Sequence, residues 1–152
     1  MVENQNRARL ILCGLGVTVF LGLVVKSHSV TEEAQATGAK MAKVWMLDSV
    51  ERYRHAWLVQ GEPDFMEMDG FHLRMTEYGL VSPFTAEGKL DCAYWLAVHY
   101  PQRKIMASEL AEIRGMSKSS HYVCNFYYRS GQKIAISSEA NNLIVNVNLS
   151  TE

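Results

Sequence analysis

Motifs for catalysis and for metal or cofactor binding are missing from this chain of 152 residues. Its three cysteines form no C-x-x-C pair, and no two of its five histidines have the spacing of zinc ligands. A G-x-S-x-G motif and a phosphate-binding glycine loop are absent as well. We therefore expect a protein that is not an enzyme and that uses no cofactor or metal ion. Four histidines are expected to be partly exposed or at the edge of a core: His55, His72, His99 and His121.

An excess of basic charge is also missing. The chain has 15 basic and 16 acidic residues, which give a formal net charge of −1. Nucleic acids are bound by clustered lysines and arginines, and the sequence shows no basic stripe of this kind. We expect no nucleic-acid partner.

The most distinctive feature that is present is an uncharged apolar run from Leu10 to Val25, which follows Arg9. As a helix the run would span about 24 Å, slightly less than the hydrocarbon core of a bilayer, and flanking basic side chains can bridge the difference. We expect a transmembrane helix over residues 10–25. Because Arg7 and Arg9 precede it, the positive-inside rule predicts a cytoplasmic tail at residues 1–9 and an exported domain at residues 26–152.

A cleaved secretory signal is the alternative for this segment, because a basic start followed by an apolar run is its usual pattern. The nearer small-residue site, Ser27 to Ser29, has bulky Lys26 and His28 around it. The other site, Ala34 to Ala36, lies well beyond the run. We therefore favour a retained anchor.

Small residues recur every four positions within the run, at Gly14, Thr18 and Gly22. They share one face of the predicted helix, where small side chains let a second helix approach closely. We expect this face to pack against another membrane helix, and simple exposure to lipid is the alternative.

Two of the cysteines, Cys92 and Cys124, fall in the predicted exported domain, whereas Cys13 falls in the apolar run. Disulfides persist outside the cytoplasm, so we expect Cys92 and Cys124 to be joined. Closing a loop of this size stabilises a fold by about 3 to 4 kcal/mol in the loop-entropy account. Two buried free thiols are the alternative.

A long amphipathic helix is predicted over residues 30–60, because apolar residues recur there at helical spacing. A capping pattern that begins at Ser29 predicts its start. The Asp69-Gly70 pair predicts a hairpin, and residues 92–98 fit a short helix. Residues 109–114 are expected to form one or two helical turns, and residues 115–120 a loop.

Beyond residue 120, alternating apolar residues predict an antiparallel three-stranded meander. Its apolar face needs a cover, and the stripe of the long helix is the best one available. The expected fold class is therefore α+β, with the long helix packed on an antiparallel sheet. The residues expected in this helix–sheet core are Met46, Val50, Tyr53, Trp57 and Trp95.

Val123 and Tyr127 alternate with the apolar residues of the first meander strand, so they lie on its opposite face. Burial under the segment 92–120 is one interpretation of these residues. If they are exposed, they form a partner surface, for which tyrosine is well suited.

The order of these elements resembles the plan of type IV pilins and pseudopilins. Four segments resemble, more specifically, a biogenesis protein family of the mannose-sensitive haemagglutinin (MSHA) type IV pilus: Arg7 to Ile11, Ala56 to Leu58, Leu90 to Pro101 and Tyr122 to Tyr128. The resemblance implies a single-pass protein of the bacterial inner membrane with a pilin-like domain in the periplasm. It implies a non-enzymatic role in pilus biogenesis, with pilus-assembly proteins, minor pilins or a second copy as partners.

True pilins are cut just before the apolar run and carry a glutamate five residues into it. After Gly14 and Gly16 the corresponding positions are Val19 and Leu21, so the chain departs from the pilin pattern. A component of the assembly machinery or an uncut pilin-like cap fits better than a major subunit. A membrane-anchored ligand-binding or sensory module and a type II secretion pseudopilin-like component are the alternatives.

Overall fold

The computed structural model of the protein describes residues 2–118, 121–139 and 142–149, without the side chains of residues 2–11, 25–32, 139 and 149. The chain divides into two compact units, Met1–Ala34 and Gln35–Glu152. Each unit is described by itself below. The fold class is α+β, with an antiparallel sheet and one disulfide.

The first unit consists of the N-terminal part of helix α1, which runs from Val2 to Val59. Every side chain described between residues 12 and 24 is exposed. Among the described residues, no helix is both long and apolar enough to cross a membrane. The helix start predicted at Ser29 is wrong, because α1 passes this residue without interruption. The amides that a serine cap would satisfy are bonded within the longer helix instead.

In the second unit, α1 ends at Val59 close to the predicted position. Gly61 takes a positive φ of 82°, and the Glu62 amide donates to the Trp57 carbonyl over 3.0 Å. The predicted hairpin is confirmed as β1 (Phe65–Met68) and β2 (Phe71–Arg74). Its turn residues Asp69 and Gly70 have φ values of 54° and 79°, as a type I′ turn requires.

The predicted short helix is confirmed as α2 (Cys92–His99). Asp91 caps its start, since the Asp91 carboxylate accepts a hydrogen bond from the Tyr94 amide over 2.8 Å. The segment between the hairpin and α2 is held by two isolated bridges, Met75 with Val81 and Phe84 with Leu90.

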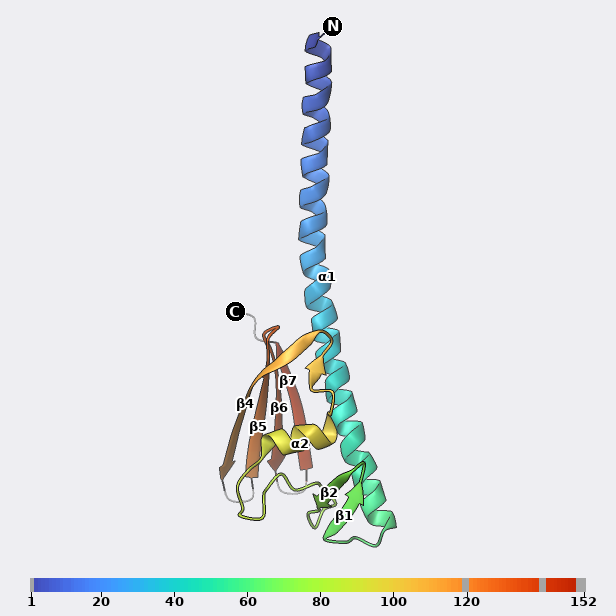
Figure 1. The fold of residues 1–152 in the computed structure, drawn as a ribbon, viewed down its shortest axis with the longest axis vertical. Coiled ribbons are helices and arrows are strands. Elements are labelled where there is room, and N and C mark those ends of the chain that lie inside the picture. Colours follow the sequence, from blue (N-terminus) through green and yellow to red (C-terminus); the bar gives the residue numbers. More distant parts are fainter. Residues whose placement is uncertain (1, 119–120, 140–141, 150–152) are drawn as a thin grey trace. The chain divides into compact units, whose positions relative to one another are not determined.

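A five-stranded antiparallel sheet follows α2, with its strands in sequence order (Figure 1). The strands are β3 (Lys104–Ile105), β4 (Ser108–Lys118), β5 (His121–Tyr128), β6 (Gln132–Glu139) and β7 (Asn142–Leu149). The predicted meander is confirmed as β5 to β7, and β3 and β4 extend it.

The helical turns predicted at residues 109–114 and the loop predicted at residues 115–118 are wrong, because β4 runs to Lys118. The last two residues of the predicted loop, 119 and 120, lie outside the described residues. The error has a physical reason. Leu110 and Ile113 are three residues apart, which imitates a helical spacing, yet both face the core. A bulge between Leu110 and Glu112 inserts one residue into the strand and returns Ile113 to the inner face.

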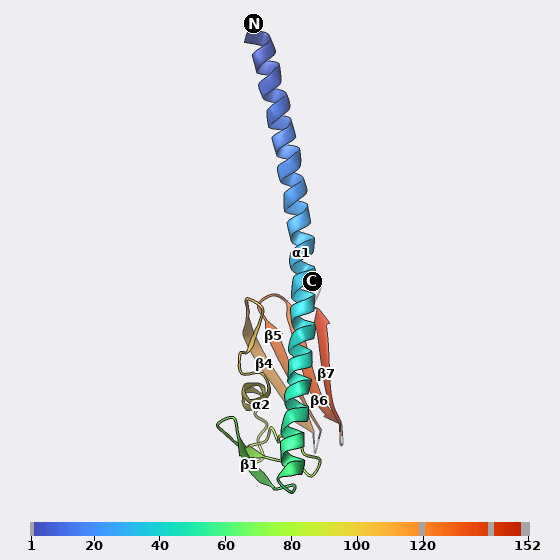
Figure 2. The same ribbon diagram turned by 90° about the vertical axis from the view of Figure 1, so that its right-hand side faces the viewer.

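The core lies between α1 and one face of the sheet, and Figure 2 shows α1 in front of the strands. Met46 and Val50 of α1 and Trp95 of α2 belong to the cluster packed on the sheet. Tyr53 and Trp57 are also buried, but they belong to a second cluster with the hairpin residues. The five predicted core residues are therefore divided between two clusters, since the last turns of α1 extend past the sheet to β1 and β2.

The predicted disulfide joins Cys92 at the start of α2 to Cys124 in β5, with a Cα–Cα distance of 5.7 Å. Gly115 of β4 is the register partner of Cys124. A Cβ at Gly115 would lie 2.7 Å from Cys92 Sγ, so only glycine leaves room for the bridge at this point. The disulfide thus connects α2 to the central strand of the sheet, and it passes over β4 where Gly115 has no side chain.

Candidate interaction surfaces

The face of the sheet that points away from α1 is called the outer face here, and its side chains follow from the strand register. One row across β4 to β7 consists of Met116, Val123, Ser137 and Ile144. Met116 is 68% exposed and Ile144 is 39% exposed. In Figures 1 and 2 no helix lies over this face. The row is therefore a mainly apolar stripe that is open to contact.

The neighbouring part of the outer face is cationic and aromatic. Arg114 and Lys133 lie over the ring of Tyr127, at 5.1 and 5.5 Å from its centroid. Arg114 also donates to Glu112 over 2.7 Å, and this hydrogen bond lowers the pKa of the Glu112 carboxyl. Burial of Tyr127 under the segment 92–120 is wrong, because that segment reaches β5 as the adjacent strand β4.

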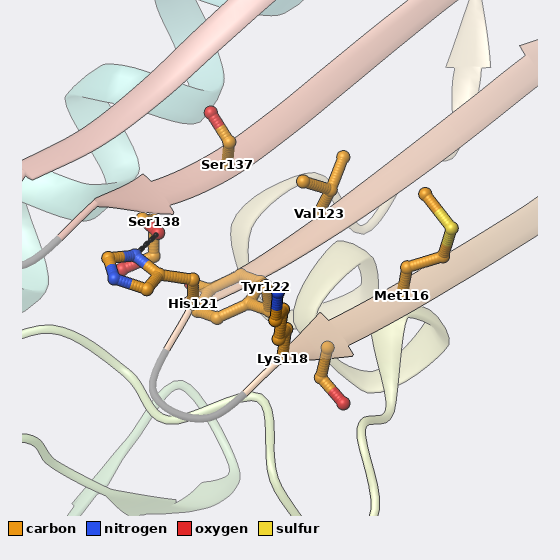
Figure 3. A pocket seen from close by; sticks show the side chains of 8 residues that line it. Met116, Lys118, His121, Tyr122, Val123, Ser137 and Ser138 are labelled. Atoms are coloured by element: carbon orange, nitrogen blue, oxygen red, sulfur yellow. Dashed lines mark hydrogen bonds between the residues drawn. The ribbon is translucent and has the colours of Figure 1, made fainter.

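A hollow of about 830 Å³ lies beside the apolar row, at the C-terminal end of β4 and the N-terminal end of β5 (Figure 3). Its lining residues are Met116, Ser117, Lys118, His121, Tyr122, Val123, Ser137 and Ser138. The His121 Nδ1 donates to the Ser138 carbonyl over 3.2 Å, which fixes one wall of the hollow. Val123, one of the two residues of the possible partner surface, therefore belongs to the row and also lines the hollow.

The predicted packing residues of the apolar run lie in the first unit. Apart from the backbone of α1 itself, no described atom lies within 4 Å of a Cβ built at Gly14 or Gly22. The Thr18 hydroxyl donates to the Leu15 carbonyl over 2.9 Å, so its hydrogen bond is made within the helix. This face of α1 is open among the described residues, and we call it the Gly14–Gly22 groove because two of its positions carry no side chain.

The setting of His99 differs from the prediction, because its side chain is buried, at 3% exposed, and does not lie at the edge of the core. Its ring lies 4.4 Å from Trp95 and 5.4 Å from Tyr53, and its Nδ1 lies 3.2 Å from Ser49 Oγ. Burial, with a smaller contribution from Arg52, lowers the pKa of His99 to about 3. The ring is therefore neutral at neutral pH and joins the two core clusters. Its position four residues after Trp95, on the same helix face, is the signal that could have revealed this.

These surfaces carry groups that are suited to contact with other proteins. The described side chains contain no group of three His, Cys, Asp or Glu residues that could hold a metal ion. The apolar row, the Tyr127 cluster and the groove on α1 present apolar, aromatic and cationic groups, which are typical of protein interfaces. Comparison of the chain with models of protein families, with curated proteins and with solved structures finds no match.

Proposed function

We propose that this protein is a membrane-anchored accessory protein of type IV pilus biogenesis, related to the MSHA system. One observation carries the proposal. A single helix, α1, contains an exposed apolar stretch at residues 12–24 and, later in the same helix, the stripe that covers an antiparallel sheet. This is the plan of pilin-like proteins, and the resemblance of four segments to the MSHA biogenesis proteins agrees with it.

Anchoring in the inner membrane supplies the cover that the apolar stretch of α1 needs. Leu12, Phe20 and Leu23 are each more than 60% exposed in the structure. Keeping such side chains in water costs about 1.5 to 3 kcal/mol each relative to burial. A bilayer removes this cost, and the arginines before the run favour a cytoplasmic N-terminus. The domain is then periplasmic, where the Cys92–Cys124 bridge persists.

Within the pilus machinery the protein would act through contacts. The outer face offers an apolar row and an aromatic cluster, whereas α1 offers the Gly14–Gly22 groove. The missing pilin glutamate argues against ordinary insertion into a fibre. We therefore place the protein with the assembly platform or with minor pilins.

A ligand-binding module is a second candidate function, and the hollow at the end of β4 and β5 favours it. The two functions differ in what they require. A sensor must pass its signal to another protein when its ligand binds, whereas an assembly factor needs only stable contacts with pilus proteins.

Replacing Gly14 and Gly22 together by leucine tests the membrane part of the proposal. Leucine fills the groove but favours the bilayer, so insertion should persist while cross-linking to pilus-assembly proteins falls at least about tenfold, equivalent to about 1.4 kcal/mol. Gly16→Leu is the matched control, because residue 16 lies on another face of the helix. Unchanged cross-linking in the double variant would remove α1 from the contact surface.

A further inference from the structure

The two edges of the sheet differ in how they are protected. The β3–β4 edge has a two-residue strand, a bulge and the charged residues Glu112, Arg114 and Lys118. These devices are the ones that prevent edge strands from pairing with other chains. β7 has none of them: it contains no charge and no proline, and its register with β6 is unbroken from Asn142 to Leu149. β7 is therefore an unguarded edge.

The register also shows which backbone groups of β7 point to the free edge. The Ser138 carbonyl faces β5, where it accepts from His121. Successive residues of a strand alternate in direction, so Ser137 and its partner Ile144 bond to each other. Leu143, Val145 and Val147 then direct their N–H and C=O groups away from β6. No described residue is paired with these groups.

The side chains along this edge are apolar on the inner face, and on the outer face Ile144 is an apolar residue among asparagines. Ile144 ends the apolar row of the outer face, and Leu143 and Val147 are only partly buried on the inner face. An added strand would extend the sheet and cover these side chains with its own. The complement of β7 is thus an extended, uncharged strand with an apolar residue opposite Ile144.

We propose that the free edge of β7 binds an extended apolar strand of another pilus-assembly protein by β-augmentation. The proposal rests on the proposed function for the identity of the partner. A second copy of the chain fits less well. In the two antiparallel registers that pair the most residues of two β7 strands, Ile144 lies opposite Asn146 or Asn148, which leaves the isoleucine without an apolar partner.

Val147→Pro removes one outward N–H while leaving the bonds between β7 and β6 in place, and proline is tolerated on an edge of this kind. Val147→Ala is the matched control, since it shortens the side chain but keeps the N–H. In the full chain, Val147→Pro should lower the amount of co-purified pilus-assembly protein at least about tenfold, whereas Val147→Ala should retain most of it. Asn146→Lys, which places a charge at the edge, serves as a second variant if the proline variant fails to fold.

Amide hydrogen exchange on the wild-type chain gives the direct readout. The amides of Val145 and Val147 should exchange at least about tenfold more slowly in detergent-solubilised pilus-assembly complexes than in the purified chain. Equal exchange in both samples, or co-purification that survives Val147→Pro and Asn146→Lys, would overturn the proposal and leave the function intact. Concentration-dependent protection in the purified chain alone would assign the edge to a second copy. Loss of pilus proteins from the wild-type sample would instead refute the function.

Discussion

Trp95→Ala should lower the free energy of unfolding by about 3 to 5 kcal/mol. Trp95 is 1% exposed, stacks on Phe126 at 6.3 Å and lies against His99. Its removal leaves a cavity between α2 and the sheet and deprives the neutral His99 ring of a packed aromatic neighbour. Urea denaturation followed by circular dichroism would measure the loss.

Trp45→Ala is the control, because it makes the same chemical change on α1 at a residue that is 51% exposed. We expect it to cost less than about 1 kcal/mol, since surface substitutions have small effects. Equal losses in the two variants would show that α2 does not provide the centre of the core.

Replacing Cys92 and Cys124 together by alanine should cost about 2 to 5 kcal/mol of stability. The bridge spans 32 positions of the chain and joins α2 to β5. Its loss increases the conformational entropy of the unfolded chain and releases the start of α2, where Cys92 packs on Gly115. Alanine leaves no unpaired hydroxyl in the core, which keeps the result interpretable as loss of the bridge.

Cys13→Ala is the matched control for this experiment, because Cys13 is free and exposed. It should leave stability unchanged. Mass spectrometry of the unreduced protein should find the two bridged peptides linked. Free alkylation of both thiols in protein taken from an oxidising compartment would contradict the account.

The parts of the fold that follow from local chemistry could be predicted from the sequence. The Asp69-Gly70 pair needs positive φ at both residues, so it marks its hairpin without any tertiary information. The strands β5 to β7 carry most of their core residues at every second position, and Asp91 is a good capping residue directly before α2. In each case the signal lies within a few neighbouring residues.

The parts that depend on contacts between distant residues could not be predicted. The bulge in β4 makes an inner-facing strand look helical, and only pairing with β5 reveals it. Ser29 has the chemistry of a cap, but a cap is used only where a helix begins, and here α1 continues. Tyr53 and Trp57 belong to the stripe of α1, yet the hairpin rather than the sheet covers them.

Some residues of the candidate surfaces could be predicted from the sequence, and others could not. Val123 and Tyr127 follow from strand alternation alone, and Cys92 with Cys124 follows from compartment and count. Ile144 was not predicted as a surface residue, because it lies on the outer face of β7, where the remaining outward residues are all asparagines. An exposed isoleucine on the unguarded edge of β7 is the observation that suggests a strand-binding site.

Counting surface pili on cells that lack this protein tests its proposed role in pilus biogenesis. We expect pili of the MSHA type to disappear and the wild-type chain to restore them, whereas the Gly14→Leu, Gly22→Leu variant should insert in the membrane without restoring them. Normal numbers of working pili on cells without the chain would contradict a role in pilus biogenesis.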